Sequence, residues 1–231
     1  MSNCLDGLNW GDFPIFLKET LLQEFSSDCY TSVVPIREGD IVFDFGASIG
    51  FFPYSMKQVQ LEHIYCIEPC HELIPALIHN LNNCCFDSSI IYGAVSEEDE
   101  EFVLFGSELK IRREDCYKQK APFLNFQKLL QITGVEKIDY IKTDCEGGEY
   151  SIFNEINIPW IKKNVSRAVG EWHLGTPELK VKFKNFAPLL KEFKFFQIND
   201  ISGYNITESF LNDLSGFINY YQEIIIHINN E

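Results

Sequence analysis

Short apolar runs recur along the chain and alternate with stretches of helical spacing. Between the second and third runs, Leu73, Leu77 and Leu81 recur every fourth residue, which predicts one face of a helix. The alternation predicts an α/β domain with a mostly parallel sheet and helices on both faces. The predicted strands are IVFDF (41–45), HIYCIEP (63–69), SIIYGAV (89–95), KIDYIKTD (137–144), RAVGEWH (167–173), FKFFQIN (193–199) and YQEIIIHIN (221–229).

Two regions stand apart from this alternation. Residues 1–38 precede the first strand and contain FLKETLLQEF (16–25), which predicts an N-terminal helical extension of a core spanning 39–231. Residues 96–131 combine the acidic run EEDEE, the alternating FVLFG and the mixed-charge LKIRREDCYKQK, which predicts a solvated excursion with the length of a lid. No linker, repeat or low-complexity tract divides the chain, so we expect one domain over 1–231.

The first strand ends in residues that have almost no side chain. In DFGASIG, Gly46 and Gly50 permit a tight turn and a close approach to the backbone, at a point where a helix would begin. Asp44 would present a carboxylate to the same crevice. Glu68 ends the second strand about 20 residues after Gly46, where dinucleotide-type folds place an acidic residue that holds ribose hydroxyls. The pattern predicts a nucleoside site at these two strand ends.

The composition of the loop narrows the choice of nucleotide. It lacks the third spaced glycine of G-x-G-x-x-G, which lets a helix pack close under a pyrophosphate. The preceding Asp44 suits an amine better than a phosphate. A cofactor with a ribose, a cationic head and no phosphate fits best, which indicates S-adenosylmethionine, with NAD as the less favoured alternative.

Charge and composition bear on partners and location. The chain has 34 acidic and 19 basic residues and a net charge of -15, which would repel a polyphosphate backbone, so we expect no nucleic-acid partner. No apolar window approaches the roughly 18 residues of a membrane span. The first residues lack a basic start followed by an apolar stretch, and we expect a cytoplasmic protein.

Eight cysteines raise the question of a disulfide framework or a zinc site. They contain no C-x-x-C pair, and several lie in apolar runs. We expect free thiols. The positions are Cys4, Cys29, Cys66, Cys70, Cys84, Cys85, Cys116 and Cys145.

Five segments, taken in order, resemble one known family. These segments are similar to parts of the FkbM-family methyltransferases, which are S-adenosylmethionine-dependent O-methyltransferases. They are IVFDFGASIGFF, CIEP, GAVS, IDYIKTDCEGGEYSIF and VGEWH. The resemblance runs from about Gly39 to His173. Its most specific part is KTDCEGGE (142–149), which fits K-x-D-x-E-G-x-E. It implies the class I, Rossmann-like fold: a seven-stranded sheet with six parallel strands and the last strand antiparallel.

The resemblance also implies roles for single residues. Glu68 would hold the ribose, while Ala94 and Val95 at the end of the third strand would border the adenine. Ser48 stands where the family often has asparagine. The residues implied at the methionine end of the cofactor are Asp44, Gly46, Ala47, Ser48 and Gly50.

Methyl transfer to an alcohol needs a proton acceptor, because a free alkoxide is scarce at neutral pH. The fourth strand delivers Lys142 and Asp144, and the fifth delivers Glu171 and His173; residues two apart share one side of a strand. We expect Asp144 to be the general base, with His173 as the second choice. Glu171 would orient either one, or bind a divalent metal together with Asp144, or these carboxylates would act by charge alone.

These features predict an O-methyltransferase that acts on a hydroxyl of a sugar, glycan or small polyol-like acceptor. A non-catalytic module of the same fold and, less favoured, an NAD-dependent oxidoreductase stay open as alternatives. Glu146 and Glu149 are expected to cap the following helix or brace the loop. Trp160 and Trp172 are expected to be buried aromatics rather than the wall of a sugar site.

Overall fold

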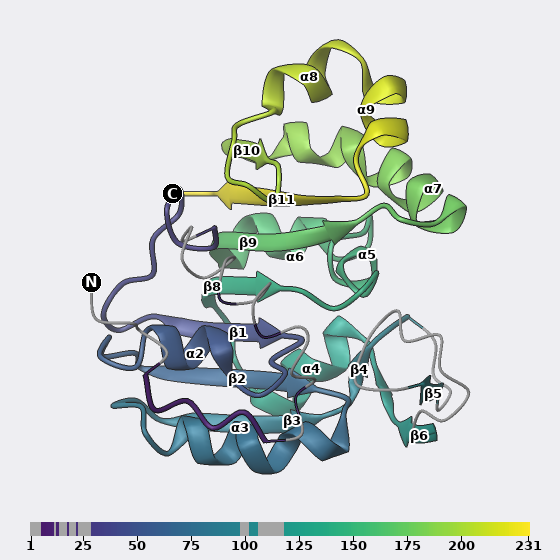
Figure 1. The fold of residues 1–231 in the computed structure, drawn as a ribbon. Coiled ribbons are helices and arrows are strands. Elements are labelled where there is room, and N and C mark those ends of the chain that lie inside the picture. The colour runs from purple at the N-terminus through teal and green to yellow at the C-terminus, as the bar shows by residue number, and fades with distance from the viewer. Residues whose placement is uncertain are drawn as a thin grey trace.

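The computed structural model describes residues 6–11, 13, 18, 22, 29–97, 102–105 and 118–231 of the chain. Of the helix expected over 16–25, Lys18 and Leu22 are described, and both are helical. Most of the run EEDEE, and residues 106–117 of the expected excursion, lie outside the described residues. Figure 1 shows one central sheet, running from β3 beside α3 to β10 beneath α8 and α9.

Seven strands form the central sheet in the order β10-β11-β9-β8-β1-β2-β3. β11 pairs antiparallel with both β10 and β9, and the other pairings are parallel. The predicted sheet, with six parallel strands and the last strand antiparallel, is confirmed. The strands are β1 (Ile41–Phe45), β2 (His63–Glu68), β3 (Ser88–Tyr92), β8 (Ile138–Thr143), β9 (Val165–His173), β10 (Phe195–Asn199) and β11 (Glu223–Asn229).

Helices cover both faces of this sheet, as predicted. Alternate residues of β1 enter different apolar clusters: Val42 packs in the cluster that holds Leu77 and Leu81, whereas Phe43 packs with Phe126. The helices are α2 (Phe51–Ser55), α3 (Ile74–Leu81), α4 (Phe126–Thr133), α5 (Glu149–Ile152), α6 (Ile158–Asn164), α7 (Pro177–Phe186), α8 (Thr207–Asn212) and α9 (Leu214–Tyr220), with 3-10 turns at His71–Leu73 and Ala187–Glu192.

Local chemistry sets several helix ends. The side chain of Asn125 accepts a hydrogen bond from the Lys128 N–H at the start of α4, and Gly134 ends this helix with a φ of 69°. Thr176 caps α7 in the same way, and Pro177 follows at the first helical position, where a missing N–H is tolerated. These signals are short-range and therefore readable from the sequence.

The third strand is shorter than predicted. It ends at Tyr92, because Gly93 takes a φ of 157° and turns the chain away from the sheet. Ala94 and Val95 instead form β4 (Ala94–Val95), which pairs with β7 (Phe123–Leu124). Ala94 and Val95 therefore belong to a separate two-stranded sheet and not to the central sheet.

The described parts of the expected excursion over 96–131 include strands and a helix. β5 (Phe102–Phe105) pairs antiparallel with β6 (Lys118–Ala121), which includes part of the mixed-charge stretch predicted as a loop. Phe126 and Leu129 of α4 are buried in the core. The excursion thus ends before Phe126, because an amphipathic helix returns the chain to the sheet.

Two further expectations bear on the described residues. The thiols of five described cysteines are free, as predicted: Cys66, Cys70, Cys84, Cys85 and Cys145. Cys4 and Cys116 lie outside the described residues. In the described part of the chain, the helices are too short or too polar to cross a bilayer.

Candidate functional site

A cavity of about 460 Å³ opens at the carboxyl ends of β1, β2 and β8. Its volume is typical of small-molecule sites, and open α/β sheets bind ligands at this edge. Its wall combines the glycine-rich loop after β1 with the loops after β2 and β8. The lining residues are Phe13, Tyr30, Gly46, Ala47, Ser48, Phe51, Phe52, Ile67, Glu68, Pro69, Cys70, Leu73, Gly93, Ala94, Val95, Ser96, Phe123, Lys142, Asp144, Cys145, Glu146, Gly147, Gly148, Ser151, Leu179 and Lys182.

The glycine-rich loop is tied to the strands on either side of it. The N–H groups of Gly46 and Ala47 both donate to the carbonyl of Ile67, at 3.0 and 3.1 Å. Gly46 has a φ of 78°, and a Cβ atom at this position would overlap the carbonyl oxygen of Asp144. Only glycine fits between the ends of β1, β2 and β8, which explains why a buried strand ends there without side chains.

Glu68 bridges this loop and the turn after β2. Its Oε2 accepts from the Ser48 N–H and its Oε1 from the Cys70 N–H, both at 2.6 Å. Burial raises the pKa of Glu68 to about 7 despite these two hydrogen bonds. Each carboxylate oxygen keeps a second lone pair, and Glu68 lines the cavity, so it can still accept from a ligand hydroxyl.

Ser48 holds the loop in an unusual conformation. Its φ of 52° places a non-glycine residue in the left-handed region, where asparagine is better tolerated than serine. Ala47 and Ser48 line the cavity, but Gly50 does not. Gly50 instead starts α2 and faces the side chain of Leu77.

Asp44 lies beneath the loop and outside the cavity wall, unlike the position expected from its place in the sequence. Its side chain is fully buried, and Lys142 Nζ lies 3.2 Å from its Oδ1. Burial raises the pKa of Asp44, and the charge of Lys142 opposes this effect. Lys142 also donates to the Gly46 carbonyl at 3.1 Å. The pair therefore supports the loop from below.

Asp144 is the carboxylate of the predicted catalytic set that reaches the cavity most directly. Its side chain is 31 % exposed, and the Tyr30 hydroxyl donates to its Oδ2 at 3.4 Å. Lys142 Nζ lies 4.0 Å from the same oxygen, so the predicted same-side pair is confirmed. Tyr30 comes from the segment before the first strand, and nothing in its sequence context marks it as a cavity residue.

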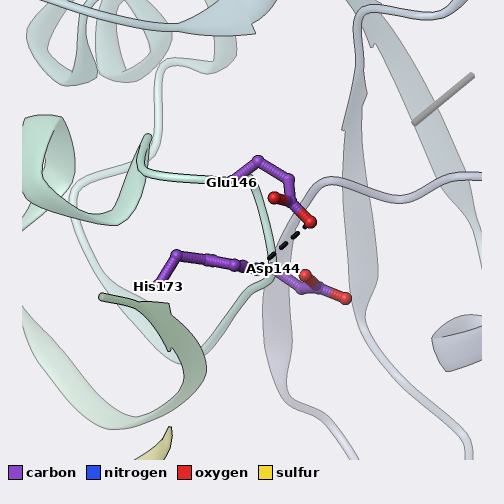
Figure 2. Close-up of side chains that lie close together, drawn as sticks. All are labelled: Asp144, Glu146 and His173. Carbon is purple, nitrogen blue, oxygen red and sulfur yellow. Dashed lines mark ion pairs between the residues drawn. The ribbon is translucent and has the colours of Figure 1, made fainter. Parts of the chain in front are cut away.

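His173 is the last residue of β9, and three glutamate carboxylates lie within 4 Å of its ring nitrogens. Its Nδ1 lies 3.2 Å from Glu149 Oε1. Its Nε2 lies 3.1 Å from Glu146 Oε1, the contact drawn as a dashed line in Figure 2. Burial alone would lower the pKa of His173, but Glu149 and Glu146 outweigh it and hold this pKa well above its ordinary value. The raised pKa and the two carboxylate contacts of the ring favour Asp144 over His173 as the base.

Glu149 organises this corner of the site. It is fully buried, and its two oxygens accept from the N–H groups of Cys145 and Gly147, at 2.9 and 2.7 Å. The expectation that Glu149 braces the loop is confirmed. Attraction to the charge of His173 and the backbone hydrogen bonds outweigh burial, so the pKa of Glu149 is lowered, whereas burial raises that of Glu146.

Glu171 lies close to His173 but is not grouped with Asp144. Its Oε1 lies 3.7 Å from His173 Nε2, and neither residue belongs to the cavity wall. Among the described residues, possible metal ligands form two groups, Asp144 with Glu146 and His173, and Glu171 with His173 and Glu223. Asp144 and Glu171 belong to different groups, which have His173 in common, and their expected pairing around one metal stays a prediction.

Two predictions about apolar residues can be compared with the cavity wall. Ala94 and Val95 line the cavity even though they have left the third strand. Trp172 is buried and stacks on Phe186 with ring centroids 4.0 Å apart, as expected of a core residue, and Trp160 packs edge-on against Phe126. The aromatic part of the wall comes from Phe13, Tyr30, Phe51, Phe52 and Phe123 instead.

No family model matches the sequence, and no curated protein matches it either. The fold is similar to that of fibrillarin, a pre-rRNA processing protein, from Methanococcus jannaschii, with a TM-score of 0.52 and 16 % identity over 96 % of this chain and 77 % of that one. This likeness, together with the strand order, shows the class I methyltransferase fold. The FkbM resemblance stays a prediction.

Two further solved structures are similar to a lesser degree. Aeropyrum pernix fibrillarin in complex with S-adenosyl-L-methionine has a TM-score of 0.47 and 11 % identity, over 90 % of this chain and 74 % of that one. Precorrin-6y C5,15-methyltransferase from Geobacter metallireducens has a TM-score of 0.44 and 10 % identity, over 97 % of this chain and 94 % of that one.

Proposed function

We propose that this protein is an S-adenosylmethionine-dependent O-methyltransferase that acts on a hydroxyl of a sugar, glycan or small polyol-like acceptor. The observation that carries the proposal is the meeting of three strand ends at one cavity. Glu68 and the loop around Gly46 supply a nucleoside site there, and Asp144 supplies a carboxylate from the next strand. The fold is that of class I methyltransferases.

The cofactor would lie across the ends of β1 and β2. Glu68 would accept from the ribose hydroxyls with the lone pairs that Ser48 and Cys70 leave free. Gly46, Ala47 and Ser48 would border the methionine end, and Ala94 and Val95 the adenine. Asp44 would act through Lys142 and the loop rather than by touching the cofactor.

The reaction is an in-line displacement, in which most of the acceleration comes from holding the three reacting atoms in line. When bound, the cofactor would supply its methyl group to the acceptor oxygen, and the electron pair of the broken carbon–sulfur bond would stay on sulfur. The hydroxyl proton passes to the carboxylate of Asp144. Tyr30 and Lys142 would hold this carboxylate toward the cavity.

The proposed acceptor class rests on charge and on the resemblance. A net charge of -15 disfavours a nucleic acid, in spite of the structural likeness to a pre-rRNA processing protein. The aromatic residues of the wall, among them Tyr30 and Phe52, offer apolar faces to a sugar ring. The hydroxyl acceptor itself follows from the FkbM resemblance.

Calorimetric titration with S-adenosylhomocysteine, with NAD in parallel, tests the cofactor. We expect micromolar binding of the first and none of the second. Transfer of a labelled methyl group to a panel of sugars and polyols then tests the reaction. Binding of NAD instead would support an oxidoreductase, and binding of neither would support a non-catalytic module.

A further inference from the structure

We propose that Asp144, Glu146 and His173 bind a divalent cation at the edge of the cavity. One donor atom from each residue lies within 4.8 Å of the donor atoms of the other two. All three residues could therefore contact the same cation. Figure 2 shows Glu146 and His173 pointing toward one another with Asp144 beside them; His173 ends β9, and Asp144 and Glu146 follow the end of β8. The purpose of such a cation rests on the proposed function, but its binding does not.

The histidine is presented as metal-ligating histidines usually are. Its Nδ1 faces Glu149 at 3.2 Å, while its Nε2 faces the cluster. A carboxylate behind the ligating imidazole fixes the ring orientation and the tautomer, and it increases ligand basicity. Glu149 lies outside the three ligands and is itself fixed by two backbone N–H groups, so the imidazole is held before any cation arrives.

The position of the cluster links it to the cavity. Asp144 and Glu146 both line the cavity wall, whereas His173 closes the cluster from the protein interior, with only 4 % of its surface exposed. A cation held there would have protein ligands on one side and open positions toward the cavity on the other. Open positions of this kind distinguish catalytic metal sites from structural ones.

The donor set limits the choice of metal. One imidazole nitrogen with two carboxylates suits Mn²⁺, Fe²⁺, Co²⁺ or Zn²⁺ better than Ca²⁺, which prefers oxygen ligands alone. When bound, such a cation lowers the pKa of a hydroxyl that approaches it.

A second arrangement competes for the same imidazole. Glu171 and Glu223 form a group with His173, and Glu171 lies 3.7 Å from Nε2, compared with 3.1 Å for Glu146. Glu171 and Glu223 are not cavity residues, so a cation bound there would face away from the acceptor. These two carboxylates therefore supply matched control variants for the proposed site.

The test is a titration of the full chain with Mn²⁺ after dialysis against a chelator, with free Mn²⁺ followed by electron paramagnetic resonance. We expect one bound ion per chain. Asp144→Asn, Glu146→Gln and His173→Asn should each weaken Mn²⁺ binding at least tenfold. Glu171→Gln and Glu223→Gln should change it less than threefold. Circular dichroism checks that each variant is folded.

Three results would overturn the proposal. In the first, the folded wild-type protein does not bind Mn²⁺ at millimolar concentrations. In the second, Glu171→Gln or Glu223→Gln loses Mn²⁺ binding but Glu146→Gln does not. In the third, none of the five substitutions affects Mn²⁺ binding. S-adenosylhomocysteine titration of the same samples separates this failure from that of the proposed function. Cofactor binding without Mn²⁺ binding rejects the metal site alone, and Mn²⁺ binding without cofactor binding rejects the cofactor alone.

Discussion

The ammonium group of Lys142 lies 3.2 Å from the carboxylate of Asp44, and both side chains are buried under the glycine-rich loop. Burial disfavours the charge of Lys142, but Asp44 and Asp144 outweigh this effect and raise its pKa above the ordinary value. Lys142 also holds the carbonyl of Gly46. One residue thus couples the floor of the candidate site to its loop and to its proposed base.

Loss of Lys142 should destabilise the protein strongly. Lys142→Met leaves Asp44 buried without a compensating charge, and we expect a decrease of roughly 3–5 kcal/mol in the free energy of unfolding, measured by urea denaturation. The control is Lys137→Met, which breaks the more exposed pair of Lys137 with Asp139 and should cost less than about 1 kcal/mol. Adding Asp44→Asn to Lys142→Met should restore part of the loss; equal effects of the two lysine variants would refute this account.

Gly46→Ala should abolish cofactor binding and destabilise the fold. The new methyl group would overlap the Asp144 carbonyl, so the ends of β1 and β8 would have to separate. Gly39 is the matched control, because its φ of 79° nearly equals the 78° of Gly46 and no atom lies within 4 Å of a Cβ there. Gly39→Ala should cost only about 1–2 kcal/mol of strain and leave S-adenosylhomocysteine affinity intact. Thermal unfolding and calorimetry measure both; similar behaviour of the two variants would show that steric overlap is not decisive.

Cofactor affinity should depend on pH through Glu68. Its pKa of about 7 means that it is half protonated near neutrality, and only the ionised form accepts from ligand hydroxyls with both oxygens. S-adenosylhomocysteine affinity should therefore fall as the pH decreases from 8 to 6, by up to about tenfold per unit below 7. Glu68→Gln should bind weakly with little pH dependence. The exposed Glu62→Gln should follow the wild-type curve, and an unchanged curve for Glu68→Gln would remove Glu68 from this role.

Asp144 and Glu68 should separate catalysis from binding. Asp144→Asn removes the proton acceptor but keeps the shape of the side chain, so we expect kcat to fall by about 10²–10⁴ with S-adenosylhomocysteine affinity changed less than about threefold. Glu68→Ala should instead weaken cofactor binding. The exposed Asp87→Asn should leave both unchanged. The division of roles would be contradicted if both variants lost binding equally in calorimetry.

Much of the architecture follows from the sequence because its signals are local. The apolar runs and their spacing predict the parallel sheet, and the caps at Asn125 and Thr176 mark helix starts through contacts within four residues. The carboxyl ends of parallel strands lie along one edge of a sheet, so the convergence of Gly46, Glu68 and Asp144 could be predicted without knowing the strand order.

The partners of these residues depend on contacts between distant segments. No periodicity indicates that Lys142 pairs with Asp44, that Tyr30 reaches Asp144, or that Glu149 orients an imidazole from the next strand. The turn at Gly93 likewise depends on the pairing of β4 with β7. The sequence by itself determined which residues stand at the strand ends. Only the tertiary structure, through register and strand order, decided which of them face the cavity and which face one another.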